Sequence, residues 1–260
     1  MSGVILSVQN DFVRMARTLK DKKGRTQQGA FLVEGVKCVG ELLAHQPSLL
    51  RTLVVTEDAG EEWVERVRAL GRHAVTVAPH VMAAICDTKT PQGLFCLVHM
   101  PKASLADMNA ATGVLLCENV GDPANVGAMI RSAAGLGLGG VVLSPGCADA
   151  FSPKALRASM GAVGRIPVVS SPVDAAVAHL RAAGAVVLAT TLEGAVPYTE
   201  APQGRPFVLM VGNEAAGLSP EAVALADERI AIPMHRGVES LNAAAAATAL
   251  MFWLTQPAGC

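Results

Sequence analysis

The sequence predicts an α/β protein with two domains. Short apolar runs rich in branched residues alternate with helix-like segments along most of the 260 residues, and 51% of the residues are hydrophobic. In the second half of the chain this alternation predicts a mostly parallel sheet with helices on both faces. A polar stretch at 101–112, which contains proline, lysine, serine, aspartate and asparagine, predicts the boundary between the domains.

The composition and the termini exclude several classes of protein. A net charge of −1 and an aromatic content of 3% are typical of a globular α/β protein, not of a disordered or fibrous one. The longest apolar stretch, 241–254, is too short to span a bilayer. The first residues lack the basic region and cleavage site of a secretory signal, so a cytoplasmic location is expected.

Cysteine and histidine spacing predicts no metal. The six cysteines form no Cys-x-x-Cys pair, and the six histidines show no metal-ligand spacing. The cysteines are therefore expected to be small buried hydrophobic residues of a reduced compartment.

The first hundred residues predict a small α/β domain. An amphipathic helix is expected at 10–23, ending near Gly24. Further helices are expected at 37–44, 61–70 and 81–86. The expected strands are 30–33, 49–55, 74–77 and 94–98.

The first helix and its end carry a basic segment. Six cations face a single acid in it, which suits contact with phosphate backbones. A solvated helix face is an equally weighted alternative. The candidate RNA-binding residues are Arg14, Arg17, Lys20, Lys22, Lys23 and Arg25.

The second half of the chain predicts six strands. Each is short, apolar and bounded by glycine, proline or polar residues. The expected helices are 128–136, 153–161, 173–183 and 241–254. The expected strands are 114–117, 141–143, 166–169, 186–189, 207–211 and 230–234.

A glycine pattern at 135–140 spells Gly-x-Gly-x-x-Gly, which in a dinucleotide-binding unit leaves a strand and opens a helix. Here the pattern closes a helix and enters a strand, so a C-cap and a tight turn are expected. This placement argues against a nucleotide-dependent oxidoreductase. The phosphate-binding sequence Gly-x-x-x-x-Gly-Lys-[Ser/Thr] is also absent.

Polar residues of this half gather where strands end, which is where ligands bind in an open α/β sheet. Three loops carry them: Asn119 and Asn125 with Arg131 close behind, Gly212-Asn213-Glu214 through Leu218, and Ile232 through Asn242. In order and spacing these segments resemble the three motifs of the SpoU/TrmH family of RNA ribose 2′-O-methyltransferases, in the SPOUT superfamily. The resemblance spans about 114–254.

The first domain is similar to the L30e-like substrate-binding domain of that family. The residues that carry this similarity are Asn10, Arg25, Phe31, Glu34-Gly35 and Pro91-Gln92-Gly93. The resemblance implies an L30e-like α/β domain at 1–104 and a SPOUT domain at 108–260, with a parallel sheet and a deep C-terminal trefoil knot.

The resemblance also implies S-adenosyl-L-methionine as the cofactor. Its adenine would be held by backbone groups in a dry cleft, with Thr190 at the edge. The remaining candidate cofactor-binding residues are Met210, Gly212, Ile232, Met234 and Leu241.

Five residues are implied in catalysis. Arg131 would act on the ribose 2′-hydroxyl, either as a base or as a clamp on the substrate phosphate, and guanidinium groups stay protonated at ordinary pH. Asn125 would position Arg131 or the ribose. Glu214, Ser240 and Asn242 would fix the loops and bind ligand.

The implied activity is methylation of a ribose 2′-hydroxyl in RNA, with 23S-type ribosomal RNA favoured over transfer RNA. The alternatives are a transfer RNA 2′-O-methyltransferase and a non-catalytic RNA-binding protein. A homodimer through the knotted domain is implied, and the helix at 241–254, apolar nearly all round, suits such an interface.

Overall fold

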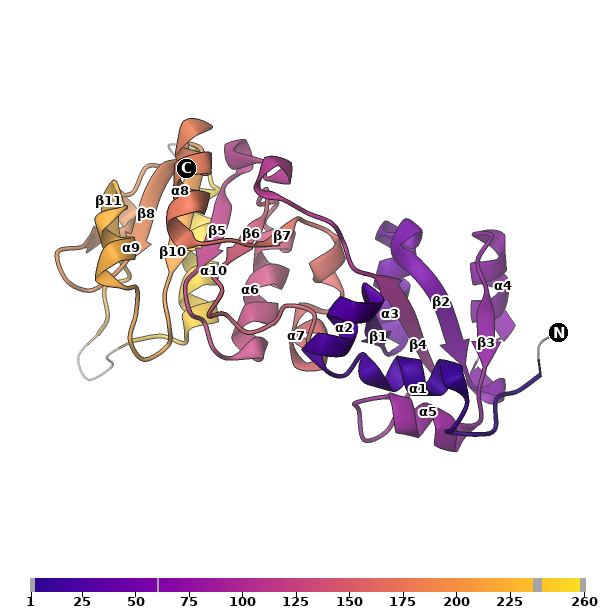
Figure 1. The fold of residues 1–260 in the computed structure, drawn as a ribbon. Helices are drawn as coiled ribbons and strands as arrows, with labels where there is room; N and C mark the ends of the chain where they lie inside the picture. Colours follow the sequence, from indigo (N-terminus) through magenta and orange to yellow (C-terminus); the bar gives the residue numbers. More distant parts are fainter. Residues whose placement is uncertain (1–2, 60, 236–239, 258–260) are drawn as a thin grey trace. The chain divides into compact units, whose positions relative to one another are not determined.

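The computed structural model describes residues 3–59, 61–235 and 240–257, and Figure 1 shows its fold. Of the cysteines, Cys260 lies outside these residues. The chain divides into two compact units. Unit 1 comprises 1–102 and 151–165, and unit 2 comprises 103–150 and 166–260. The first boundary lies at 102/103, close to the expected division at 104–108, and the segment 151–165, expected in the second domain, belongs to unit 1.

Unit 1 is built on a four-stranded mixed sheet with the order β1-β4-β2-β3. β4 is antiparallel to both of its neighbours, and β2 is parallel to β3. The strands are β1 (Ala30–Glu34), β2 (Leu50–Val55), β3 (Ala74–Thr76) and β4 (Leu94–His99). The helices are α1 (Asp11–Thr18), α2 (Lys22–Gln28), α3 (Val36–His45), α4 (Glu61–Ala69), α5 (Pro79–Ile85) and, from the later segment, α7 (Pro153–Ser159).

The single helix expected at 10–23 is wrong, because the chain forms α1 and α2 with a break at 19–21. Arg25 explains the break. Its side chain is buried, and its Nη1 donates to the carbonyl oxygens of Leu19 at 2.9 Å and Lys20 at 2.7 Å. A charged donor from the next helix therefore satisfies the carbonyls that α1 leaves open at its C-terminus.

Unit 2 contains a seven-stranded parallel sheet with the order β7-β6-β5-β10-β8-β11-β9. The strands are β5 (Val114–Cys117), β6 (Val141–Leu143), β7 (Val168–Ser170), β8 (Val186–Thr190), β9 (Val196–Pro197), β10 (Phe207–Val211) and β11 (Glu228–Ala231). The helices are α6 (Pro123–Gly135), α8 (Val173–Ala182), α9 (Pro220–Ala224) and α10 (Ala243–Leu254). The six expected strands are present, and the two-residue β9 had no apolar run to predict it.

Strand β10 lies near the middle of this sheet, between β5 and β8, and all five of its side chains are buried. β5 is likewise buried along its whole length. Both faces of the sheet are covered by helices (Figure 1), which explains why these strands are uniformly apolar instead of alternating. α6 packs against α10, and the hydroxyls of Ser132 and Thr248 meet at 2.7 Å between them.

Two element boundaries differ from expectation for local reasons. α6 starts at Pro123 instead of 128, because Asp122 caps its N-terminus through a hydrogen bond from the Ala124 N–H and proline suits the first turn. β11 ends at Ala231 rather than 234, because Pro233 has no N–H to donate to a ladder.

The glycine pattern at 135–140 is a helix end and a turn, as predicted. α6 ends at Gly135, and β6 begins at Val141. Gly139 lies so close to the chain that a Cβ atom there would sit 2.0 Å from the Asn109 carbonyl oxygen. These glycines therefore serve packing and the turn and form no phosphate-binding loop.

In the part of the chain that the structure describes, no helix is long and apolar enough to cross a membrane. The same residues contain no group of three or more His, Cys, Asp or Glu side chains arranged to hold a metal. Four cysteines, Cys38, Cys86, Cys96 and Cys117, are free and buried as expected, and Cys147 is half-buried.

Candidate active site

A cavity of about 730 Å³ opens in unit 2 where β8, β10 and β11 end. This is the carboxyl edge of the parallel sheet, where ligands of α/β proteins bind. Its volume lies in the range of about 300–1,000 Å³ that is usual for cofactor sites. Eight sequence-predicted residues line it: Thr190, Gly212, Glu214, Ile232, Met234, Ser240, Leu241 and Asn242.

The loop after β10 forms one wall of this cavity and closes on itself. The backbone groups of Asn213 and Gly217 exchange two hydrogen bonds of 2.9 Å. The side-chain oxygen Oδ1 of Asn213 also accepts from the N–H groups of Ala215 and Ala216. At Gly212 a Cβ atom would lie 2.1 Å from the Gly217 carbonyl carbon. Only glycine permits this close approach, so Gly212 shapes the wall through its backbone.

Asn125 joins the three polar loops in one hydrogen-bonded relay. Its Nδ2 donates to Glu214 Oε1 at 2.8 Å, and its Oδ1 accepts from Asn242 Nδ2 at 3.0 Å. Asn242 also caps α10, since its Oδ1 accepts from the N–H groups of Ala244 and Ala245. The buried Asn125, in the first turn of α6, thus couples this helix to the loop after β10 and to the start of α10.

The Glu214 carboxylate fixes the loop before α6 through hydrogen bonds. Besides the Asn125 amide, it accepts the N–H groups of Gly121 at 3.3 Å and Asp122 at 3.4 Å. Burial acts to raise the pKa of this carboxyl, but these hydrogen bonds and its own N–H outweigh burial, so the pKa is lowered from its ordinary value. Glu214 is therefore held as an anion at neutral pH.

Glu118 connects the end of β5 to the start of α9, and the site predicted from the sequence did not include it. It directly follows β5 and is buried; its two carboxylate oxygens accept from the N–H and the hydroxyl of Ser219, each at 2.7 Å. Ser219 in turn caps α9. The only signal in the sequence was the position of Glu118 at a strand end, which does not distinguish an anchor from a ligand.

Three predicted site residues lie outside the lining of the cavity. Met210 is fully buried in β10, and its carbonyl oxygen accepts from Thr190 Oγ1 at 2.9 Å. Asn125 lies behind the wall as the centre of the relay. Arg131 is exposed on α6, and among the described residues no carboxylate forms an ion pair with it.

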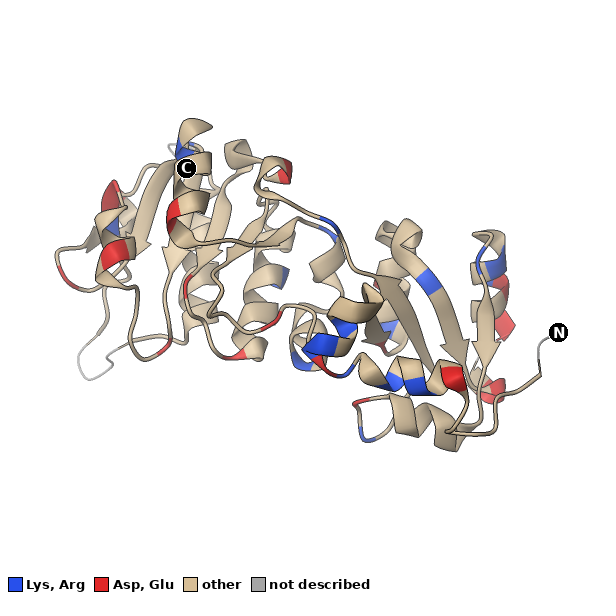
Figure 2. Ribbon diagram, in the orientation of Figure 1, with Lys and Arg blue, Asp and Glu red and all other residues tan. Residues whose placement is uncertain are grey.

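The basic segment of unit 1 is only partly an exposed patch. Figure 2 shows lysine and arginine along α1 and α2. Arg14, Arg17, Lys22 and Lys23 are exposed, and Arg14 pairs with Asp11. These four residues and the half-exposed Lys20 are called the basic patch below.

Arg25 corrects the predicted set of RNA-binding residues. Its side chain is 3% exposed, and its guanidinium holds the end of α1. A guanidinium in that position stabilises unit 1 and does not present its charge to a phosphate.

The lining of the unit 2 cavity suits a cationic ligand with apolar parts. Its charged side chains, among the described residues, are the carboxylates Glu193 and Glu214, with no lysine or arginine. Apolar walls come from Leu218, Ile232 and Met234. S-adenosylmethionine has a net positive charge from its sulfonium, an ammonium–carboxylate pair and an apolar adenine ring, so this lining fits it.

Comparison with known proteins agrees with this geometry. Residues 113–252 match the family model of the SpoU rRNA methylases, and residues 10–96 match the model of an MRM3-like substrate-binding domain. A 23S rRNA (guanosine(2553)-2′-O)-methyltransferase of Bacillus subtilis is 37% identical over 250 residues, covering 96% of this chain and 98% of the relative. A 23S rRNA (uridine(2479)-2′-O)-methyltransferase of Streptomyces viridochromogenes is 30% identical, covering 93% of this chain and 88% of the relative.

Solved structures give the same result. The AdoMet-bound rRNA methyltransferase of Sinorhizobium meliloti superposes with a TM-score of 0.87 at 30% identity, with 97% of each chain covered. The AdoMet complex of the SpoU methyltransferase AviRb of Streptomyces viridochromogenes gives 0.82 at 31% identity, with 95% of this chain and 97% of that chain covered. With the matched family model extending over more than half of its length, this chain belongs to the SpoU rRNA methylase family.

Proposed function

We propose that this protein transfers a methyl group from S-adenosyl-L-methionine to a ribose 2′-hydroxyl of 23S-type ribosomal RNA. The observation that carries the proposal is the cavity at the carboxyl edge of the unit 2 sheet, whose walls come from loops joined through Asn125. The family match and the two relatives that act on 23S ribosomal RNA support the reaction and the substrate class.

The cofactor supplies a methyl group on a sulfonium, which is already electrophilic, so the protein mainly has to align the reactants. The apolar walls and the backbone of the loop at 212–218 bind and orient the donor in the cavity. Glu214, held as an anion, gives the cavity the negative potential that a cationic donor requires. The cofactor would supply the methyl group to the 2′-oxygen and leave as its demethylated thioether, and the hydroxyl proton would pass to solvent water.

Arg131 contributes a guanidinium on the exposed side of α6, outside the cavity lining. We assign it to the substrate: a bidentate clamp on the phosphate next to the target ribose suits its planar fork of donors. Ser240 and Asn242 line the cavity on the third loop, and Asn242 fixes this loop through its cap on α10. The basic patch of α1 and α2 supplies phosphate contacts farther along the RNA.

The assembly and location follow from the same proposal. A homodimer through unit 2 would cover α10, whose apolar side chain Phe252 is 56% exposed. The trefoil knot would lie in the chain that forms the cavity, within the methyltransferase domain proposed at 108–260. The similarity to a Bacillus subtilis methyltransferase of 23S ribosomal RNA supports a cytoplasmic location.

Transfer of tritiated methyl groups tests the reaction. Unmodified 23S ribosomal RNA, 16S ribosomal RNA and transfer RNA, each transcribed in vitro, are incubated with protein and labelled cofactor, and the modified nucleotide is mapped by its resistance to alkaline hydrolysis. We expect label in 23S RNA alone, at one 2′-O position. Label in transfer RNA would reassign the substrate, and RNA binding without label would make the protein a non-catalytic RNA binder.

A further inference from the structure

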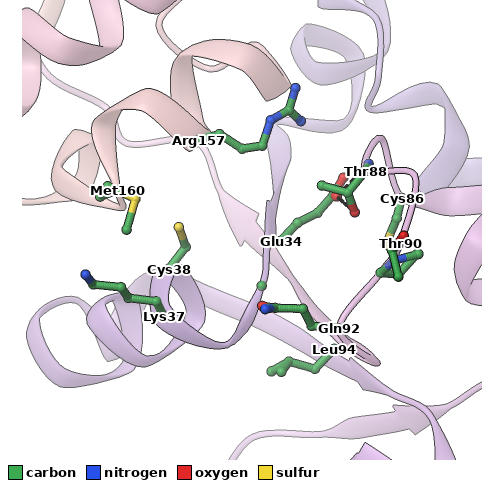
Figure 3. A pocket seen from close by; sticks show the side chains of 12 residues that line it. Glu34, Lys37, Cys38, Cys86, Thr88, Thr90, Gln92, Leu94, Arg157 and Met160 are labelled. Carbon is green, nitrogen blue, oxygen red and sulfur yellow. Dashed lines mark hydrogen bonds between the residues drawn. The ribbon is translucent and has the colours of Figure 1, made fainter.

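A second cavity, in unit 1, gathers residues to which the methyl-transfer reaction gives no role. It measures about 300 Å³ and lies between the start of α3, the segment 86–92 and α7. Figure 3 shows the side chains around it. Two residue pairs on which the resemblance of the first domain rests, Glu34-Gly35 and Pro91-Gln92, both line this cavity. A hydrogen bond from the Val36 N–H to Gln92, 56 residues farther along the chain, joins the two segments.

Glu34 and Gln92, which line this cavity, form hydrogen bonds that hold its walls in place. Glu34 accepts the N–H of Asp87 at 2.7 Å, the N–H of Thr88 at 3.2 Å and the hydroxyl of Thr88 at 3.1 Å. Its charge is therefore compensated by the loop that it fixes. Gln92 Oε1 accepts the Val36 N–H at 3.0 Å, which leaves the amide NH₂ group as a donor at the cavity.

The remaining lining has two chemical parts. An apolar surface is formed by Leu94, the Met160 thioether and the Cys38 thiol. Burial raises the pKa of the Cys38 thiol, so the thiol stays neutral. Lys37 and Arg157 add two exposed cations at the rim. An apolar floor with donors and cations at the rim matches a base and its phosphate.

Arg157 can exchange its partner at little cost. It pairs with Asp87 at 2.7 Å, and the two side chains are 41% and 39% exposed. An ion pair this exposed contributes little to stability, because water screens it. A phosphate oxygen can therefore share or replace this contact without unfolding α7.

The basic patch adjoins the cavity through one contact. Lys20 Nζ donates to the carbonyl oxygen of Cys86 at 2.8 Å, and Cys86 lines the cavity. Cations that can follow a phosphate backbone thus lead to a pocket of nucleotide size. This continuity favours a nucleotide within a strand of RNA over a free nucleotide.

We propose that the unit 1 cavity receives one unstacked nucleotide of the RNA substrate, with its base on the surface of Leu94 and Met160 and its phosphate at Lys37 and Arg157. This inference rests on the proposed function and names the contact by which unit 1 recognises the RNA. Unstacked bases in single-stranded loops and bulges are the elements that proteins read in RNA. The pocket therefore selects an RNA shape that presents such a base.

Two variants and a matched control test the pocket. Thr90→Trp fills the cavity from an exposed lining position, and Lys37→Ala removes a rim cation. Arg68→Ala removes one exposed cation of α4, outside the cavity. Affinity for unmodified 23S-type RNA is measured by filter binding at several salt concentrations, affinity for S-adenosylmethionine by calorimetry, and folding by thermal denaturation.

We expect Thr90→Trp to weaken RNA binding about tenfold or more, the effect of losing one base contact. Lys37→Ala should weaken it less and lower the slope of log affinity against log salt by about 1. Arg68→Ala should leave both quantities unchanged, and all three variants should keep the wild-type melting temperature and cofactor affinity. In addition, 2-aminopurine substituted for the base that enters the cavity should change its fluorescence when the wild-type protein binds the RNA. This change should be absent with Thr90→Trp.

RNA affinity unchanged in Thr90→Trp and Lys37→Ala would overturn the pocket while leaving the methyltransferase intact. Equal losses in Lys37→Ala and Arg68→Ala would also overturn it, because the effect would then be general electrostatics. A protein that binds RNA through this pocket but neither binds nor uses the cofactor would instead refute the proposed function.

Discussion

Replacing Asn125 with aspartate tests the relay that joins the three loops. The change keeps the size of the side chain but replaces the Nδ2 donor, 2.8 Å from Glu214 Oε1, with a carboxylate oxygen. Two like charges about 3 Å apart repel by about 1.4–2.8 kcal/mol at an effective dielectric constant of about 40–80, which suits an exposed partner. The lost hydrogen bond to the carboxylate adds about 1 kcal/mol after discounting for solvent.

We therefore expect Asn125→Asp to lower the free energy of unfolding of unit 2 by about 2–4 kcal/mol at pH 7. Asn125→Ala, which removes the hydrogen bond but adds no charge, should cost about 1–2 kcal/mol because Glu214 keeps the N–H groups of Gly121 and Asp122. The assay is urea denaturation followed by the fluorescence of Trp253, which lies in unit 2, in a Trp63→Phe background that silences the other tryptophan.

The two variants should differ in their dependence on pH. In Asn125→Asp the folded pKa of one of the two carboxyls is raised above its unfolded value, so the penalty is small near pH 4 and grows toward pH 7. In the wild type the pKa of Glu214 is lowered, so its contribution to stability is present above the ordinary glutamate pKa and is lost as the pH falls. Equal stability of Asn125→Asp and Asn125→Ala from pH 5 to 8 would refute the relay.

Three further predictions concern single positions. Gly212→Ala should weaken S-adenosylmethionine binding more than tenfold by calorimetry, because its Cβ would lie 2.1 Å from loop backbone; Gly121→Ala, whose Cβ meets nothing within 4 Å, is the control that should bind normally. Arg131→Ala should reduce methyl transfer more than 100-fold in the tritium assay with cofactor affinity unchanged, and a loss of cofactor affinity would reassign the residue. Arg25→Ala should lower the free energy of unfolding by about 1–3 kcal/mol in denaturant titrations, since it leaves buried carbonyls unpaired. Arg17→Ala should instead reduce RNA affinity without changing stability. The reverse pattern would contradict the buried role of Arg25.

Much of the fold followed from local patterns in the sequence. The strands of unit 2 are uniformly apolar because helices cover both faces of the sheet, and runs such as Phe207–Val211 carry that signal. The glycines at 135–140 could be assigned to a helix end because their place between a helix and a strand was readable. The methyltransferase resemblance, confirmed by the family match, depended on three motifs whose residue types and spacing are specific.

The strand order could not be read from the same patterns. β10 lies between β5 and β8, and the short β9 pairs with β11 at the edge. Such neighbours depend on which apolar faces pack together across long stretches of chain, and similar short buried strands are interchangeable in sequence. The helix expected at 10–23 failed for a related reason, because the contact that breaks it comes from Arg25, beyond its end.

The sequence by itself indicated most of the residues that line the unit 2 cavity, because motif residues are a local property of the chain. Only the tertiary structure decided what each one does there. It made Asn125 and Glu118 anchors between loops, turned Arg25 inward, and left Arg131 exposed on α6. Burial and hydrogen-bond partners arise from segments that are far apart in the chain, so a residue's type limits its possible roles and its surroundings select one.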